Sequence, residues 1–277
     1  MSYFTTERRM DQMLAQESTR RQARGEAFVM ATVVRTMAAT SAKPGAKALV
    51  DAEGTIVVGF LGGGCVRGAV GRAARDAIRQ GQPQLLSIRP EELLQAEGVA
   101  AGDERDGVKF ARNGCPSKGA LDIFIEPVLP KDRLIICGAG PVAQALAALA
   151  ERFDFERIVC VKDTPPESLP VVDHVEIGFD DGPHWQGAPF VVVATQGAGD
   201  ALALARALDS GARHIAFVGS RRKFANLSEK LMAQGIAPEA LARVQAPAGV
   251  DIHAITPDEI ALSILADLIR LRREGAR

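Results

Sequence analysis

One glycine-rich turn in the middle of the chain constrains the fold more than any other segment. The apolar stretch 133–137 leads into Gly138-Ala-Gly140-Pro-Val-Ala143, and an Ala/Leu-rich helical pattern follows over residues 144–152. A strand, a Gly-x-Gly-x-x-Ala turn and a helix in this order are typical of dinucleotide-binding units, because the glycines let a pyrophosphate approach backbone N–H groups at the helix N-terminus. This pattern predicts ligand contacts at Gly138, Gly140, Pro141 and Val142.

The rest of the second half alternates between short apolar runs and helical patterns. The predicted strands are 134–137, 158–161, 190–194 and 214–218, and the predicted helices are 201–208, 222–233 and 257–272. Thr256 and Glu259 form a capping-box pattern at the start of the last helix. Strands that are apolar throughout are expected in a parallel sheet covered on both faces. We therefore predict a Rossmann-like domain over residues 131–277.

The first half has a different pattern, which predicts an α+β domain over residues 1–130. Helices are predicted at 6–24 and 66–80, and strands at 28–35, 47–50, 55–58, 85–88 and 121–128. The charged segment 89–109 is expected to end in a loop, and Pro-Val-Leu-Pro at 127–130 is expected to be a linker. The fold class is therefore α/β, with an α+β domain preceding the Rossmann-like domain.

Charge and composition argue against several classes of partner. The chain has 277 residues, of which 33 are basic and 34 acidic, and a net charge of −1 gives no general attraction for nucleic acid or anionic membranes. No apolar run approaches the roughly 20 residues of a membrane span, and no signal-peptide core is visible, so we expect a cytoplasmic protein. The four cysteines show no Cys-x-x-Cys pair and no His at metal-ligand spacing, which argues against structural zinc and for reduced thiols.

A second glycine-rich turn, Gly62-Gly63-Gly64-Cys65, precedes the predicted helix at 66–80. It leaves backbone donors uncovered and places a thiol at a helix N-terminus, where the helix dipole favours a thiolate. The alternative is a tight turn around a buried small residue. Cys115 lies in another turn-rich segment and is either a ligand or an incidental thiol. Cys137 and Cys160 lie in apolar strands and are expected to be inert core residues.

Small and charged residues follow the predicted strands at the edge where parallel sheets bind ligands. Asp163 lies near the position of the carboxylate that usually holds an adenosine ribose, but Lys162 beside it favours a 2′-phosphate or another anion. Thr195 follows the strand at 190–194, and Gly219-Ser220-Arg221-Arg222-Lys223 follows the strand at 214–218. These cations either bind phosphate or remain solvated at a helix start. The four histidines form no dyad with a nucleophile, so hydrolytic catalysis is not indicated.

Four segments together resemble the XdhC/CoxI/CoxF family, the accessory proteins that mature molybdenum hydroxylases such as xanthine dehydrogenase and carbon monoxide dehydrogenase. The first is Gly63-Gly-Cys65-Val, the second is Leu121-Asp-Ile-Phe-Ile-Glu-Pro-Val128, and the third is the strand and turn at 134–143. The fourth combines 217–223 with Ala246-Pro-Ala-Gly-Val-Asp-Ile252 and Thr256-Pro-Asp-Glu-Ile-Ala-Leu-Ser-Ile264. The resemblance spans nearly the whole chain, and the fourth segment is the most specific.

The resemblance implies a homodimer that binds molybdopterin or the finished molybdenum cofactor. Such proteins shield the cofactor, assist its sulfuration by a cysteine desulfurase and deliver it to a molybdenum hydroxylase apoenzyme. Cys65 would be a soft ligand to the cofactor's molybdenum or a sulfur carrier, and no catalytic residue or resident metal is predicted. The predicted cofactor contacts are Gly62, Gly63, Gly64, Cys65, Arg67, Cys115, Gly138, Gly140, Pro141, Val142, Asp163, Thr195, Ser220, Arg221 and Lys223.

Several departures from the family pattern suggest a divergent member, near the CoxF-like branch. Arg67 replaces a common Glu, Cys115-Pro-Ser-Lys-Gly119 replaces a tighter Cys-Gly-Gly turn, Gln196 opens a loop where a His is expected, and His253 replaces a Gly. Two alternatives to a maturation factor stay open: an FAD- or NAD(P)-binding regulatory protein, and a Rossmann oxidoreductase. FAD or NADP binding is also compatible with the first interpretation.

Overall fold

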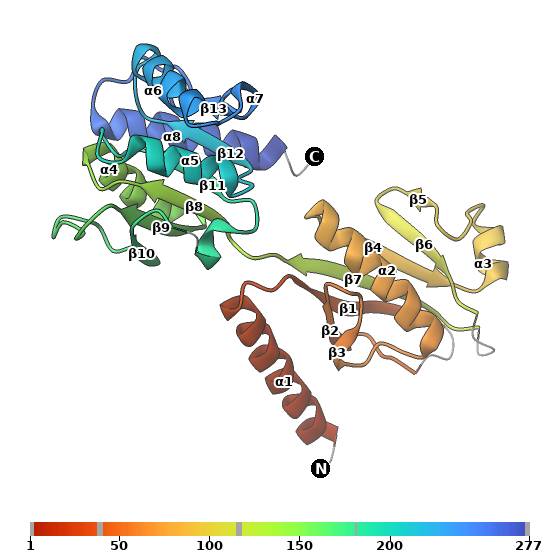
Figure 1. Ribbon diagram of the computed structural model, residues 1–277. Coiled ribbons are helices and arrows are strands. Elements are labelled where there is room, and N and C mark those ends of the chain that lie inside the picture. The colour runs from red at the N-terminus through yellow and green to blue at the C-terminus, as the bar shows by residue number, and fades with distance from the viewer. Residues whose placement is uncertain (1–2, 38–40, 115–117, 181, 275–277) are drawn as a thin grey trace. The chain divides into compact units, whose positions relative to one another are not determined.

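The computed structural model describes residues 3–37, 41–114, 118–180 and 182–274. The chain divides into two compact units, residues 1–130 and residues 131–275. Each unit has its own sheet (Figure 1). Each also has its own apolar core.

The first unit contains a seven-stranded mixed sheet in the order β3-β2-β1-β7-β4-β6-β5. Strand β1 pairs antiparallel with β2 and with β7, β7 pairs antiparallel with β4, and β4 runs parallel to β6. The elements in chain order are α1 (Tyr3–Ala23), β1 (Phe28–Met37), β2 (Lys47–Asp51), β3 (Ile56–Gly59), α2 (Gly64–Gln80), β4 (Gln84–Arg89), α3 (Glu91–Ala96), β5 (Glu104–Arg105), β6 (Val108–Arg112) and β7 (Ala120–Val128).

Side-chain alternation along β1 divides the first unit into layers. Val29, Ala31 and Val33 belong to the core that α2 covers, to which the helix contributes the buried residues Val66, Ala69, Val70, Ala73, Ala74 and Ala77. Phe28 points to the other face and packs with Leu14 of α1 and Leu49 of β2. Successive side chains of a strand point to opposite faces, so one strand serves both cores.

The expectation of a loop toward the end of segment 89–109 is met only in part. Residues 97–103 form turns without a helix or strand, but α3 and β5 were not predicted. The segment contains α3 and β5, and it leads directly into β6, which pairs with β4 as an interior strand of the sheet. These elements are difficult to predict because they are short and charged. Helix α3 has six residues and begins with the exposed acids Glu91 and Glu92, and β5 consists of the exposed pair Glu104 and Arg105. Elements this short have too few positions to show a hydrophobic period.

The second unit is a doubly wound domain with a six-stranded parallel sheet in the order β10-β9-β8-β11-β12-β13. The prediction of a Rossmann-like parallel sheet is confirmed. The elements in chain order are β8 (Asp132–Cys137), α4 (Pro141–Ala150), η1 (Glu151–Phe153), β9 (Phe155–Val161), β10 (His174–Ile177), η2 (Pro183–Trp185), β11 (Phe190–Val193), α5 (Asp200–Asp209), β12 (His214–Phe217), α6 (Arg221–Ala233), α7 (Pro238–Leu241), β13 (Val244–Gln245) and α8 (Pro257–Glu274).

Helices cover both faces of this sheet, which explains the uninterrupted apolar strands (Figure 1). Helices α4 and α8 pack on one face, and α5, α6 and α7 pack on the other. The predicted capping box of α8 is confirmed, since the Glu259 N–H donates to Thr256 Oγ1 at 3.3 Å and the Thr256 N–H donates to Glu259 Oε2 at 2.9 Å. The backbone N–H groups of Thr256 and Ile255 both donate to the Glu259 carboxylate and lower its pKa. Among the described helices, none combines the length and apolar character that crossing a bilayer requires.

Candidate functional site

The strand order of the second unit places the Gly138 turn at the position where such sheets bind ligands. From β8 the chain moves outward to β9 and β10, and then returns to β11 on the other side of β8. Doubly wound sheets bind ligands at this reversal, outside the carboxyl ends of the two central strands. Residues 138–140 follow β8 and residues 194–199 follow β11, so both loops flank the reversal point.

Gly138 and Gly140 are required for different reasons. Gly138 has a φ of 115°, and a Cβ there would lie 2.5 Å from the backbone oxygen of Ala194. Only glycine fits that turn. At Gly140 a Cβ would instead meet the side chain of Gln196, with Cδ and Oε1 at 2.6 Å. Gln196 is exposed, so the atoms that lie over Gly140 belong to a side chain able to move aside for a ligand.

Helix α4 starts with donors that a ligand can use. Gly140 is its N-cap and offers no side-chain cap, and Pro141 occupies the first turn, where its missing N–H is of no consequence. First-turn N–H groups such as that of Val142 have no acceptor within the helix. The predicted contacts Gly138, Gly140, Pro141 and Val142 therefore form one continuous turn, with the geometry of an anion site.

A buried carboxylate joins two of the other predicted contacts. Asp200, at the start of α5, is 7% exposed, and its Oδ1 accepts hydrogen bonds from Thr195 Oγ1 and from the Gly197 N–H. Its Oδ2 lies 2.6 Å from Lys223 Nζ. Burial alone would raise the pKa of Asp200, but the hydrogen bonds from Lys223, Thr195 and Gly197 outweigh it, and the pKa lies below its usual value. Lys223 is thus committed to a carboxylate.

The remaining predicted contacts of this unit have simpler surroundings. Ser220 is the N-cap of α6 and accepts a hydrogen bond from the Lys223 N–H at 3.2 Å. Arg221 begins α6 and is exposed, and Lys162 and Asp163 follow the end of β9 and are also exposed. Ser220 therefore has a structural role, whereas the exposed cations are available to a phosphate.

Asp200 and Gln196 were not predicted as contacts. Both are polar residues that follow the carboxyl end of a parallel strand, and this position is the signal by which the sequence could have indicated them.

In the first unit, the three consecutive glycines differ from one another. Gly62 has a φ of 133°, and a Cβ there would lie 3.0 Å from Val66 Cγ2. Gly63 is the N-cap of α2 with a φ of −72°, and Gly64 is the first residue of the helix. Among the residues that the structure describes, none has an atom within 4 Å of a Cβ built at Gly63 or Gly64. Neither packing nor backbone conformation requires glycine at these two positions, so the turn presents uncovered backbone to the solvent.

Cys65 follows these glycines in the first turn of α2 and is exposed. Its Sγ lies 3.5 Å from the position of a Cβ built at Gly114, so the Gly-Gly-Gly-Cys turn lies beside Gly114. Cys115 itself lies outside the described residues. Arg67 is on the same helix and is exposed. The alternative of a tight turn around a buried small residue does not fit Cys65. Cys137 and Cys160 are both fully buried, as expected of core residues.

A buried charged cluster in the first unit was not predicted. Asp122 is 4% exposed; its Oδ1 accepts from Ser87 Oγ at 2.7 Å, and its Oδ2 accepts from Arg35 Nε at 2.7 Å. Arg89, 6% exposed, lies 3.6 Å from the same carboxylate, and its backbone oxygen accepts from the Asn113 N–H at 2.6 Å. The acidic Asp122 between the apolar residues Leu121 and Ile123 of a strand was the signal in the sequence.

Comparison with known protein families gives the chain an assignment that covers both units. Residues 134–268 match the XdhC Rossmann domain, and residues 21–89 match the XdhC and CoxI family. The chain belongs to the XdhC/CoxI family. The Rossmann match contains the Gly138 turn and the Asp200 network, and the second match contains the Gly-Gly-Gly-Cys turn. The family assignment inferred from sequence motifs is confirmed.

Two curated relatives and one solved structure are similar to this XdhC/CoxI protein. It is 29% identical over 266 residues to Uncharacterized protein YqeB of Escherichia coli, covering 90% of the chain and 44% of that protein. It is 32% identical over 165 residues to a probable xanthine dehydrogenase subunit of Bacillus subtilis, covering 56% of the chain and 47% of that protein. The chain thus spans less than half the length of either. A crystal structure described as a xanthine dehydrogenase from Bacillus halodurans aligns over 90% of the chain and 92% of its own, with 21% identity and a TM-score of 0.43.

Proposed function

We propose that this protein is an accessory factor that binds the molybdenum cofactor and hands it to a molybdenum hydroxylase of the xanthine dehydrogenase kind. The observation that carries the proposal is the open Gly63-Gly64 backbone ahead of an uncapped helix and an exposed thiol, in a chain of the XdhC/CoxI family. Glycine without a conformational or packing need is expected where an outside molecule approaches the backbone. The Bacillus subtilis relative, named as a probable xanthine dehydrogenase component, supports the kind of client.

The first unit fits the pterin part of this cargo chemically. A pterin carries a phosphate, and backbone N–H groups at a helix N-terminus attract such an anion. Cys65 offers a soft sulfur ligand beside them, which suits the cofactor's molybdenum, or it accepts sulfur from a cysteine desulfurase during sulfuration. Exposed Arg67, on the first helical turns after Gly63 and Gly64, adds positive charge to the same unit.

The second unit fits a nucleotide, either the dinucleotide form of the cofactor or a separate FAD or NADP. The Gly138–Val142 turn supplies amides for a pyrophosphate, and exposed Lys162 follows the strand whose end contacts the ribose in such domains. The proposal does not include catalytic turnover by this protein. It does include a homodimer, which the family resemblance implies.

Activation of a client tests this function. Apo-xanthine dehydrogenase would be incubated anaerobically with molybdenum cofactor and the purified protein, and xanthine oxidation measured. We expect the wild type to accelerate activation and Cys65→Ala to lose most of the gain. Cys137→Ala is the control for removal of a thiol, and circular dichroism verifies folding of each variant. Activation that proceeds equally well without the protein would contradict the proposal.

Analysis of the ligand released from purified protein separates the alternatives. Recovery of a molybdopterin supports a carrier. Recovery of flavin alone, with a flavin visible spectrum and no effect on the client, favours the regulatory alternative. Oxidation of NADPH by the protein alone favours an oxidoreductase. Each readout depends on a different molecule, so one preparation distinguishes the three functions.

A further inference from the structure

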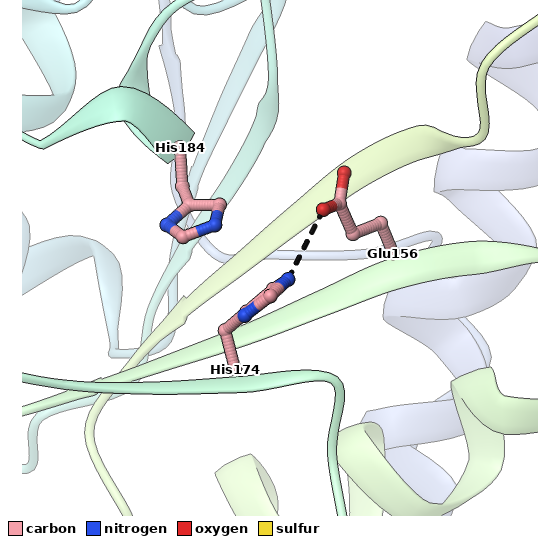
Figure 2. Close-up of side chains that lie close together, drawn as sticks. All are labelled: Glu156, His174 and His184. Carbon is pink, nitrogen blue, oxygen red and sulfur yellow. Dashed lines mark ion pairs between the residues drawn. The ribbon is translucent and has the colours of Figure 1, made fainter. Parts of the chain in front are cut away.

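Three potential metal ligands converge at the edge of the second sheet that lies opposite the Gly138 turn. Glu156 is the second residue of β9, His174 begins β10, and His184 lies in η2. One ligand atom from each lies within 4.8 Å of those from the other two. Figure 2 shows the three side chains turned toward one another from these separate elements. The amino ends of parallel strands lie away from the ligand-binding edge, so this cluster is separate from the proposed nucleotide site.

Strand pairing explains why the two strand residues meet. His174 pairs with Ile158 in the parallel register of β9 and β10, and Glu156 precedes Ile158 by one side-chain period on the same face. Nε2 of His174 lies 3.3 Å from Oε1 of Glu156. The rings of His174 and His184 have centroids 4.3 Å apart. Long-range pairing, rather than a short motif, therefore builds the cluster.

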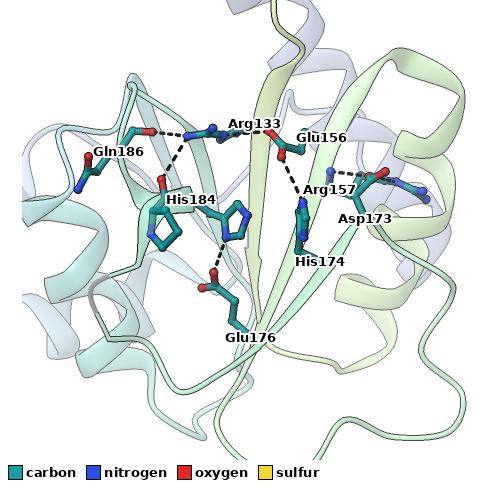
Figure 3. A network of polar contacts seen from close by, with 9 residues as sticks. Arg133, Glu156, Arg157, Asp173, His174, Glu176, His184 and Gln186 are labelled. Carbon is teal, nitrogen blue, oxygen red and sulfur yellow. Dashed lines mark hydrogen bonds and ion pairs between the residues drawn. The ribbon is translucent and has the colours of Figure 1, made fainter. Parts of the chain in front are cut away.

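Arg133 holds the cluster in place. Its Nε donates to Glu156 Oε2 at 2.9 Å, and its Nη1 donates to the backbone oxygens of Pro183 and Gln186 at 3.3 and 3.0 Å (Figure 3). One guanidinium thus positions the carboxylate and both sides of the segment that carries His184. Trp185, next to His184, is fully buried and anchors the same segment. A site fixed by its surroundings loses less entropy when it binds an ion.

Glu176 sets the orientation of the second imidazole. Its Oε1 lies 2.6 Å from His184 Nδ1, which leaves Nε2 as the nitrogen that His184 offers to the cluster. A carboxylate on the far nitrogen of a histidine is a common arrangement around bound metals, because it fixes the tautomer and makes the ligand more basic.

We propose that Glu156, His174 and His184 bind a divalent transition-metal ion, with Zn²⁺ as the best match. Two imidazoles and one carboxylate suit zinc and leave a fourth position for water. Metal–ligand bonds of about 2.0–2.1 Å in a tetrahedral site place the ligand atoms about 3.3–3.4 Å apart. Atoms that now lie within 4.8 Å of one another therefore have to close by at most about 1.5 Å, which side-chain rotation can provide. Glu156 and Glu176 against Arg133 leave one net negative charge with neutral imidazoles, which favours a cation. The side chain of His174 is 43% exposed, so an ion can reach the site from solvent.

Metal titration of the full-length protein tests this site. Protein freed of metal with a chelator would be titrated with Zn²⁺, and with Co²⁺ followed by its visible spectrum. We expect one saturable equivalent and a Co²⁺ spectrum of nitrogen and oxygen ligands, together with a higher melting temperature. His174→Gln or His184→Gln should weaken binding at least about 100-fold, and Glu176→Gln about 10-fold. His253→Gln, at a histidine whose side chain is 94% exposed, is the matched control and should bind like the wild type.

Two outcomes would overturn the proposal. The first is the lack of saturable Zn²⁺ binding by wild-type protein whose fold is verified by circular dichroism. The second is binding that survives His174→Gln and His184→Gln but is lost in Cys65→Ser, with a thiolate charge-transfer band in the Co²⁺ spectrum, which would move the ion to the other unit. Neither result depends on activity toward a client, so this test is independent of the proposed function.

Discussion

Lys223 Nζ lies 2.6 Å from Asp200 Oδ2, which links the loop after β11 to the first turn of α6. The two residues begin neighbouring helices on the same face of the sheet, and Thr195 donates to the other oxygen of the carboxylate. The pair fixes the loop that lies over Gly140, since Gln196 belongs to that loop. Lys223 thereby shapes the predicted nucleotide site without itself being free to bind phosphate.

Removal of the Lys223 charge should destabilise the protein. Lys223→Met leaves Asp200 buried with one fewer partner, and we expect a loss of about 1 to 2 kcal/mol in the free energy of unfolding, below that of a fully buried pair because solvent screens a lysine that is 40% exposed. Urea denaturation measures the loss. Lys230→Met, at an exposed lysine on the same helix, is the control and should change stability little.

The same pair should make stability depend on pH. The pKa of Asp200 is lowered in the folded protein, so its contribution is fully present above the unfolded aspartate pKa of about 3.9 and is lost as pH falls through the lower folded value. The difference between wild type and Lys223→Met should therefore stay constant from neutral pH to about pH 5 and shrink below pH 4. A difference that grows on acidification would contradict this assignment.

The three glycines before Cys65 should respond differently to alanine. Gly62→Ala should destabilise the first unit by about 1 to 2 kcal/mol, because its φ of 133° disfavours a side chain. Gly64→Ala should leave stability unchanged or raise it by up to about 1 kcal/mol, because the helix gains a better former, yet weaken cofactor binding. Gly68→Ala, at an exposed position one turn later, is the control for the helix effect alone. Equal cofactor affinity in Gly64→Ala and Gly68→Ala would exclude the turn as the contact.

The two glycines after β8 should also separate folding from binding. Gly138→Ala places a Cβ against the backbone of Ala194, which cannot move cheaply, so we expect a loss of at least about 2 kcal/mol. Gly140→Ala meets only the exposed Gln196 side chain, so the protein should fold and bind nucleotide more weakly. Thermal unfolding and a titration with the recovered nucleotide measure the two effects. Strong binding by folded Gly140→Ala would show that this turn contacts no ligand.

The cysteines should differ in reactivity by their positions. Cys65 is exposed, whereas Cys137 and Cys160 are buried. The pKa of the Cys160 thiol is raised, mainly by its hydrogen bond with Cys137 and also by burial. Iodoacetamide should modify Cys65 at least about 100-fold faster than either core cysteine in native protein. Peptide mass spectrometry identifies the modified residues. Modification of Cys160 at a rate close to that of Cys65, without unfolding, would contradict the buried position of β9.

The sequence correctly predicts turns and caps that depend on a few neighbouring residues. It does not predict contacts between residues that long-range strand pairing brings together. The Gly138 turn and the capping box of α8 were predicted from their own few residues, because a turn or a cap is encoded locally. Asp200 and Lys223 lie on α5 and α6, which are separated in the sequence by β12. Glu156, His174 and His184 come together only because β9 pairs with β10 in this register and Arg133 holds η2 in place. A sequence shows such residues but not their proximity.

Short elements escaped prediction for a related reason. Strand β6 follows a charged segment, yet it lies inside the sheet because β4 and β5 pair with its two edges. The four residues of β10, His-Val-Glu-Ile, alternate between polar and apolar side chains, but the run is too short to distinguish a strand from a loop, and its apolar residues Val175 and Ile177 are exposed in an edge strand. Their conformation depends on a partner strand, which single-sequence patterns do not describe.

The most direct test of the account is the amount of pterin that the protein retains. Wild-type protein and Gly64→Val would be purified anaerobically from cells that also make an active molybdenum hydroxylase, and the released small molecules quantified by mass spectrometry. We predict a phosphorylated pterin with wild type, several-fold less with Gly64→Val, and the wild-type amount with Gly68→Val. Wild-type protein that carries no pterin and takes up none when molybdopterin is supplied would contradict the central claim.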